Sequence, residues 1–166
     1  MGPRKTRTES GPRHLEQLFW SIRGIHSLLE VIHDTWANRF GVTTPQLVMI
    51  FALRDFDDHG TGLPVKEVAR ILDVDPTFVT TQSKILEAKS FVSRNASSED
   101  ARVVRLSLTD KSQKQLAELS IRQKKLNGYI FSEFTDQGIE ALVTKVFALK
   151  NRMEKASAIA SLDFDY

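Results

Sequence analysis

The chain has 166 residues, of which 41% are hydrophobic and 27% are charged, and this composition excludes a disordered or collagen-like protein. It contains no cysteine, which excludes disulfides, thiolate zinc sites and thiol-based redox switches. The formal net charge is only +2, so the position of the basic residues is more informative than their sum.

The first residues predict a basic arm and a cytoplasmic location. Residues 1–12 mix Pro, Gly, Arg, Thr and Ser without periodicity, which predicts a flexible segment. Residues 1–5 lack the apolar stretch of a secretion signal, and no apolar run in the chain approaches the roughly 20 residues needed to cross a bilayer. We therefore expect a soluble cytoplasmic protein with no membrane partner.

Three helices are predicted in the first half of the folded chain. From His14 to Phe40 apolar residues recur every three or four positions, which indicates a long amphipathic helix. Thr44 followed by Pro45 predicts a capped second helix that extends to Phe56 and is apolar on more than one side. After a turn rich in Gly and Asp, residues 64–72 predict a third, shorter helix.

A fourth helix is predicted from Pro76 to about residue 89, because Asp75 can cap the free N–H groups ahead of a proline in the first turn. Its inward residues would be Val79, Leu86 and either Gln82 or Ser83. Residues 91–94 and 103–108 then predict two strands around a polar loop, and two long helices follow from residues 109 and 135.

The order of these elements predicts a winged helix-turn-helix, a mainly α fold with a small β-hairpin wing. In such a fold the second helix of the motif enters the major groove of DNA. Small polar side chains on that helix can bond base edges, and basic residues around it can neutralise phosphates. The predicted DNA contacts are Thr77, Phe78, Thr80, Thr81, Gln82, Lys84, Arg94, Ser97, Asp100 and Arg102. The alternative for the threonine-rich face is an ordinary solvated helix surface.

Four short motifs in this region resemble the multiple-antibiotic-resistance regulator (MarR) family. They are Val68-Ala69 before the turn, Leu86-Glu87 late in the fourth helix, the wing motif 100–102 (Asp-Ala-Arg), and the strand end 106–109 (Leu-Ser-Leu-Thr). The resemblance implies one unit over residues 13–166, with a winged helix at about 44–109 and dimerisation helices at about 13–40 and 110–160. The chain departs from the family at Ser90 and Ser112, where glycine is common.

The resemblance also implies roles for two wing residues. Asp100 would orient a neighbouring arginine, and Arg102 would enter the minor groove, where a weakly hydrated and permanently charged guanidinium is well suited. The alternative is that Arg102 only forms a surface ion pair with Asp100 or Glu99.

The outer helices predict a homodimer, because their apolar stripes exceed what a small winged domain needs. The alternative is a monomer with a helical cap. Family members often bind small aromatic acids or phenols, and the first helix carries Trp20, Arg23 and His26. Arg23 and His26 share a helix face and can hold a carboxylate while Trp20 stacks on a ring. The alternative is that Trp20 is a packing residue.

The sequence therefore predicts a ligand-responsive repressor that binds a pseudo-palindromic DNA operator as a dimer. No nucleophile elbow, phosphate-binding glycine loop or pair of carboxylates supports an enzyme, and we expect no cofactor. No group of His, Asp and Glu has metal-ligand spacing. The competing hypothesis is a winged helix that binds protein and never contacts DNA.

Overall fold

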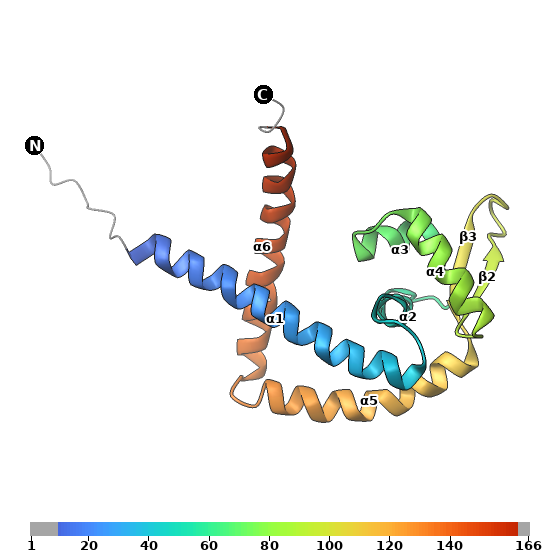
Figure 1. Cartoon of the computed structure of the whole chain (residues 1–166), viewed down its shortest axis with the longest axis horizontal. Coiled ribbons are helices and arrows are strands. Elements are labelled where there is room, and N and C mark those ends of the chain that lie inside the picture. The colour runs from blue at the N-terminus through green and yellow to red at the C-terminus, as the bar shows by residue number, and fades with distance from the viewer. Residues whose placement is uncertain (1–9, 163–166) are drawn as a thin grey trace, which may run out of the picture. The chain divides into compact units, whose positions relative to one another are not determined.

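The computed structural model describes residues 10–162 and confirms the predicted fold class: mostly helix with a small antiparallel sheet (Figure 1). Its elements are α1 (Ser10–Phe40), α2 (Thr44–Phe56), β1 (Leu63–Pro64), α3 (Val65–Leu72), α4 (Pro76–Ala88), β2 (Val92–Ala96), β3 (Val104–Leu108), α5 (Asp110–Ile130) and α6 (Asp136–Leu162).

The first two helices begin earlier than the sequence predicts. Residues 10–12, which were assigned to the basic arm, belong to α1, and the rest of the arm lies outside the described residues. The N-cap of α2 is Thr43 rather than Thr44, and Pro45 lies in the first turn. Both shifts are of the size expected at helix ends, where sequence patterns are weakest.

The chain divides into two compact units, one ending at Ala117 and the other beginning at Glu118. The first contains α1–α4, the sheet and the start of α5, and the second contains the rest of α5 and all of α6. The single unit expected over residues 13–166 stays a prediction. No helix between residues 10 and 162 has the length and apolar character needed to span a bilayer.

The sheet has three strands in the order β1-β3-β2, one more than the sequence indicated. β2 and β3 form the predicted hairpin, with Arg94 opposite Leu106. β1 pairs with the other edge of β3, with Leu63 opposite Leu106. Gly62, just before β1, has a φ of +80° and donates its N–H to Asp57 at 2.9 Å. The third strand therefore fixes the turn before α3 to the hairpin.

The core of the first unit lies where α2 meets α3, α4 and the sheet. The side chains that are essentially inaccessible to water are Leu47, Met49, Ile50, Val68, Val79, Leu86 and Leu106. α2 supplies the most buried residues, which confirms that a helix apolar on more than one side packs between neighbours.

The two serines that depart from the family pattern lie beside the core. Ser90 follows α4 with a φ of +60°, a left-handed conformation that glycine adopts at lower cost. Ser112 is fully buried in the first turn of α5, and its hydroxyl donates to the carbonyl of Phe91 at 2.5 Å. The residue common in the family would thus relieve strain at position 90, whereas at position 112 it would remove a buried hydrogen bond.

An aromatic cluster joins α1 to α2 and contains a partly buried histidine. The ring centroid of His33 lies 6.0 Å from that of Trp36 and 5.8 Å from that of Phe51. The Nδ1 atom of His33 is buried and has no hydrogen-bond partner within residues 10–162. Burial lowers the pKa of His33 below its usual 6.5, although the charge of Glu30 acts in the opposite direction.

We expect this histidine to make folding stability depend on pH. Because the folded pKa is depressed, the unfolded chain binds more protons as the pH falls below about 6.5. Its contribution is therefore complete above that pH and is lost as the pH falls through the folded pKa. Urea unfolding from about pH 7.5 to about pH 5 should show a steeper loss in wild type than in His33→Gln, which cannot titrate. Parallel profiles would contradict this assignment.

Candidate nucleic-acid interface

The turn between α3 and α4 is built by main-chain geometry and one carboxylate. Asp73 ends α3 in a left-handed conformation with φ of +53°, and the N–H of Val74 donates back to the carbonyl of Ala69 at 3.0 Å. Asp75 caps α4 by accepting the N–H of Thr77 at 2.6 Å. Hydrogen bonding by the side chain of Thr77, and then by its main chain, lowers the pKa of Asp75. The turn is short, so it holds the two helices at a defined angle.

One face of α4 is buried and the opposite face is open. Val79, Ser83 and Leu86 are inaccessible, which shows that Ser83 rather than Gln82 is the inward polar residue. The exposed predicted DNA contacts on this helix are Thr77, Phe78, Thr81 and Lys84, whereas Thr80 and Gln82 are half-buried at its borders. Ile85, which the sequence analysis did not select, is also exposed at 39%. We call the exposed residues 77, 78, 81, 84 and 85 the reading face.

The half-buried Gln82, beside the reading face, is held by a buried partner inside the unit. The Oε1 atom of Gln82 accepts a hydrogen bond from Nε2 of Gln46 on α2 at 3.0 Å. Gln46 itself is only 3% exposed. Sequence reasoning missed Gln46, because a glutamine in a helix that is otherwise apolar has no recognisable spacing to a residue 36 positions later.

Arg94 differs from the expectation that it faces DNA. Its side chain is only 12% exposed, its guanidinium donates to the buried hydroxyl of Ser83, and Nε lies 3.6 Å from a carboxylate oxygen of Glu87. The charge is thereby engaged between β2 and α4, where it ties the hairpin to the helix. Arg105 is occupied in a similar way, with hydrogen bonds to the carbonyls of Thr61 at 3.0 Å and of Gly62 at 2.5 Å.

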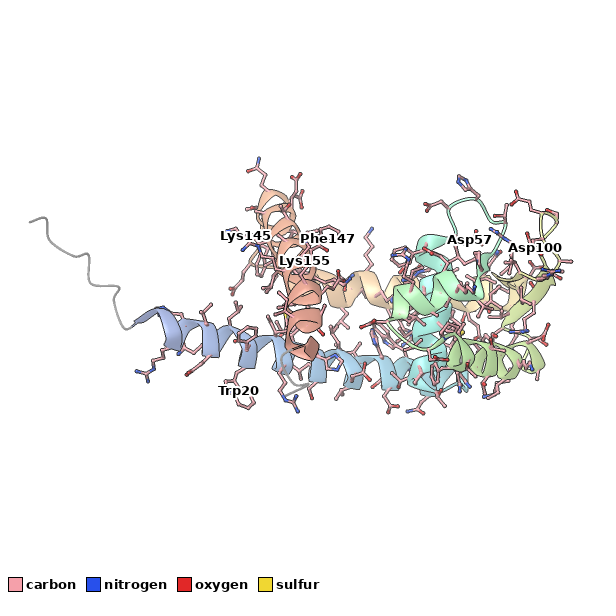
Figure 2. The ribbon with its side chains drawn as sticks, turned by 90° about the horizontal axis from the view of Figure 1, so that it is seen from above. Trp20, Asp57, Asp100, Lys145, Phe147 and Lys155 are labelled. Atoms are coloured by element: carbon pink, nitrogen blue, oxygen red, sulfur yellow. The ribbon has the colours of Figure 1, made fainter. Side chains whose placement is uncertain are left out.

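The tip of the hairpin is ordered by local hydrogen bonds, and its side chains are open to solvent. Asp100 accepts the main-chain N–H of Arg102 at 2.9 Å, and its own carbonyl accepts the N–H of Val103 at 2.9 Å. Ser97 is half-buried, and its hydroxyl accepts the N–H of Glu99 at 3.3 Å. Figure 2 labels Asp100 at this tip. Asp100 thus shapes the main chain of Arg102.

Lys84 and Arg102 are the predicted basic contacts that remain exposed. Within the part of the chain that the structure describes, neither side chain has a hydrogen bond or ion pair. The surface pair of Arg102 with Asp100 or Glu99, which was the alternative reading, is therefore not formed among these residues. An exposed, unpaired cation can neutralise a phosphate without first breaking an ion pair.

The predicted ligand residues Trp20, Arg23 and His26 lie on the exposed first half of α1. Trp20 is 72% exposed, and Figure 2 shows it projecting from the helix. Among residues 10–117 nothing closes over these side chains. A hollow of about 310 Å³ lies instead on the hairpin, lined by Thr61, residues 95–99, Arg105 and Ser107.

Comparison with known proteins finds a family match in the winged-helix segment. The MarR family profile matches residues 42–104, the segment from α2 to the start of β3. The transcriptional repressor MdtR of Bacillus subtilis is 34% identical over 97 residues, which cover 58% of this chain and 60% of that protein.

Solved structures share the fold over most of the chain. A MarR/EmrR family regulator from Acinetobacter is 21% identical with a TM-score of 0.69, covering 84% of this chain and 96% of that one. The DNA complex of MepR from S. aureus gives a TM-score of 0.68 at 16% identity, covering 81% and 94% of the two chains. The chain is therefore similar to the MarR family over residues 42–104, and it shares the fold of solved MarR regulators.

Proposed function

We propose that this protein is a transcriptional regulator that binds double-stranded DNA through the reading face and the hairpin tip. The observation that carries the proposal is the exposure of Thr77, Thr81 and Lys84 on α4. Arg94 of β2 hydrogen-bonds to this helix and so ties it to the hairpin that bears Arg102. Thr hydroxyls and methyls can contact base edges in the major groove, while the two cations neutralise phosphates. MepR, a protein of the same fold, has been solved as a complex with DNA, which supports DNA binding by this fold.

We further propose that the protein acts as a homodimer. On α1 the large apolar side chains exposed in the single chain include Leu15, Phe19, Ile25, Leu28 and Val31, each at least 50% exposed. On α6 they include Val143, Val146 and Phe147, each above 55%. Large apolar side chains exposed on both helices favour association with a second copy, which would set two reading faces about one DNA turn apart.

The regulatory sense and the effector complete the proposal. The similarity to the repressor MdtR favours repression, and we place this activity in the cytoplasm. A small aromatic acid or phenol would bind beside Trp20, Arg23 and His26, once a second copy covers them, and would lower DNA affinity. A thermal-shift screen of aromatic carboxylates and phenols should give a hit that raises the melting temperature of wild type and loses its effect in Arg23→Met.

The salt dependence of DNA binding tests the central proposal against the competing protein-binding hypothesis. The protein should first be used to select duplexes from a library with about 20 randomised base pairs, the span of two half-sites. Fluorescence anisotropy on the selected duplex should then show affinity falling steeply with salt, because counterions are released from each neutralised phosphate. A protein-binding module would select no sequence and would show no such slope.

A further inference from the structure

Gln46 is a buried polar residue whose amide is used at both ends. It lies in the first turn of α2, and its Oε1 accepts the main-chain N–H of Thr43 at 3.2 Å. Its Nε2 donates to Oε1 of Gln82 at 3.0 Å, across from α2 to α4. A side chain that is 3% exposed and satisfied at both ends has one orientation available.

The direction of this chain of hydrogen bonds follows from chemistry. The N–H of Thr43 can only donate, so the Gln46 atom that faces it must be the carbonyl oxygen. The NH₂ group of Gln46 must then be the atom that faces Gln82, and Gln82 must offer its own oxygen. Turning either amide over would place a donor against a donor. One main-chain N–H at the N-cap of α2 thus sets the orientation of a side chain on α4.

The consequence concerns what Gln82 can offer to DNA. Gln82 is half-buried at the border of the reading face, one turn from Phe78. With its oxygen turned to Gln46, the amide atom left for a ligand is the NH₂ group, a donor. Guanine O6 and N7 and thymine O4 only accept hydrogen bonds in the major groove, and cytosine N4 only donates, whereas adenine carries a donor at N6 beside its N7 acceptor. The paired contact that glutamine makes with adenine needs both its oxygen and its nitrogen.

We propose that Gln46 is a positioning residue that makes Gln82 a hydrogen-bond donor and so biases the operator base facing Gln82 toward guanine or thymine. This inference rests on the proposed DNA-binding function. It predicts that base preference at one position of each half-site is controlled by a residue that never touches DNA.

The variant Gln46→Glu tests the inference by reversing the direction of the hydrogen bond between residues 46 and 82. The new carboxylate still accepts the N–H of Thr43 but cannot donate to Gln82. The amide of Gln82 must then turn its NH₂ group inward and present its oxygen. In selections from the randomised duplex library, the preferred base at one position per half-site should change to cytosine or adenine, with about a tenfold change in relative affinity.

Two further variants separate positioning from a structural effect. Gln82→Glu keeps the bond from Gln46 and also presents an acceptor, so it should give the same change of base. In a Gln82→Ala background, Gln46→Glu should leave base preference unaltered, because the side-chain amide that would contact the base is absent. Melting curves check that each variant folds. If Gln46→Glu does not fold, the base preferences of wild type and Gln82→Glu are compared to decide whether Gln82 acts as a donor in wild type.

The outcomes distinguish this inference from the function on which it rests. The positioning role would be overturned, with DNA binding intact, by either of two results. One is that Gln46→Glu loses affinity equally for all sequences, and the other is that Gln82→Glu prefers the same base as wild type. A wild-type protein that selects no duplex at all would instead overturn the proposed function.

Discussion

Replacing Arg102 with alanine is expected to weaken binding to every DNA duplex by about tenfold at low salt and to reduce the salt slope by about one per protomer. The guanidinium lies at the exposed hairpin tip and has no ion pair within residues 10–162, so its charge is available to the DNA backbone or the minor groove. Losing it removes an electrostatic contact that carries little sequence information. Anisotropy titrations at several salt concentrations measure both quantities.

Two matched variants make this expectation specific. Arg152→Ala removes the same charge from an exposed position of α6 and should leave the slope unchanged. Thr81→Ala leaves all charges in place and should alter preference among sequences, with little effect on the slope. If Arg102→Ala and Arg152→Ala behaved alike, the hairpin tip would have no special role in binding.

Replacing Gly62 with alanine is expected to reduce the free energy of unfolding by about 3 kcal/mol, the combined cost of a strained backbone and an overpacked side chain. A Cβ at this position would lie 2.4 Å from Oγ of Ser107 and 2.9 Å from the carbonyl oxygen of Leu106. The φ of +80° adds a strain that no side-chain movement relieves. The neighbouring strand β3 would have to move away from the turn before β1.

Gly60→Ala is the matched control for this substitution. Gly60 has a similar φ of +64°, but an added Cβ would meet no atom within 4 Å. Its cost should therefore be limited to the left-handed backbone, about 1 kcal/mol. Urea unfolding of both variants gives two losses in the free energy of unfolding, and their difference is the cost of the contact with β3. Equal losses in the two variants would show that this contact does not matter.

The helices and the hairpin could be predicted because each has a period that the sequence displays. The strand at Leu63–Pro64 could not, since two residues have no periodicity and proline argues against a central strand. It pairs at the edge of the sheet, where a missing N–H is tolerated. Its partner is more than 40 residues away, so only the folded chain reveals it.

The candidate site was predictable where it depends on one element and not where it depends on two. The exposed Thr81 and Lys84 follow from the helical period and the capping residue Asp75. The fate of Arg94 does not, because whether an arginine faces solvent or a buried serine depends on how β2 packs against α4. The hydrogen bond from Gln46 to Gln82 was unpredictable for the same reason, because it depends on how α2 packs against α4.

The engagement of Arg94 with Ser83 and Glu87 limits how an effector can act on this protein. Since the hairpin and α4 are joined by a nearly buried charge, the two move together when either is displaced. A small molecule that weakens DNA binding therefore has little scope to reshape one half of the recognition surface alone. In the proposed twofold assembly, an effector would act by changing the spacing or tilt of two preformed halves. A duplex of fixed pitch would then accommodate only one half at a time.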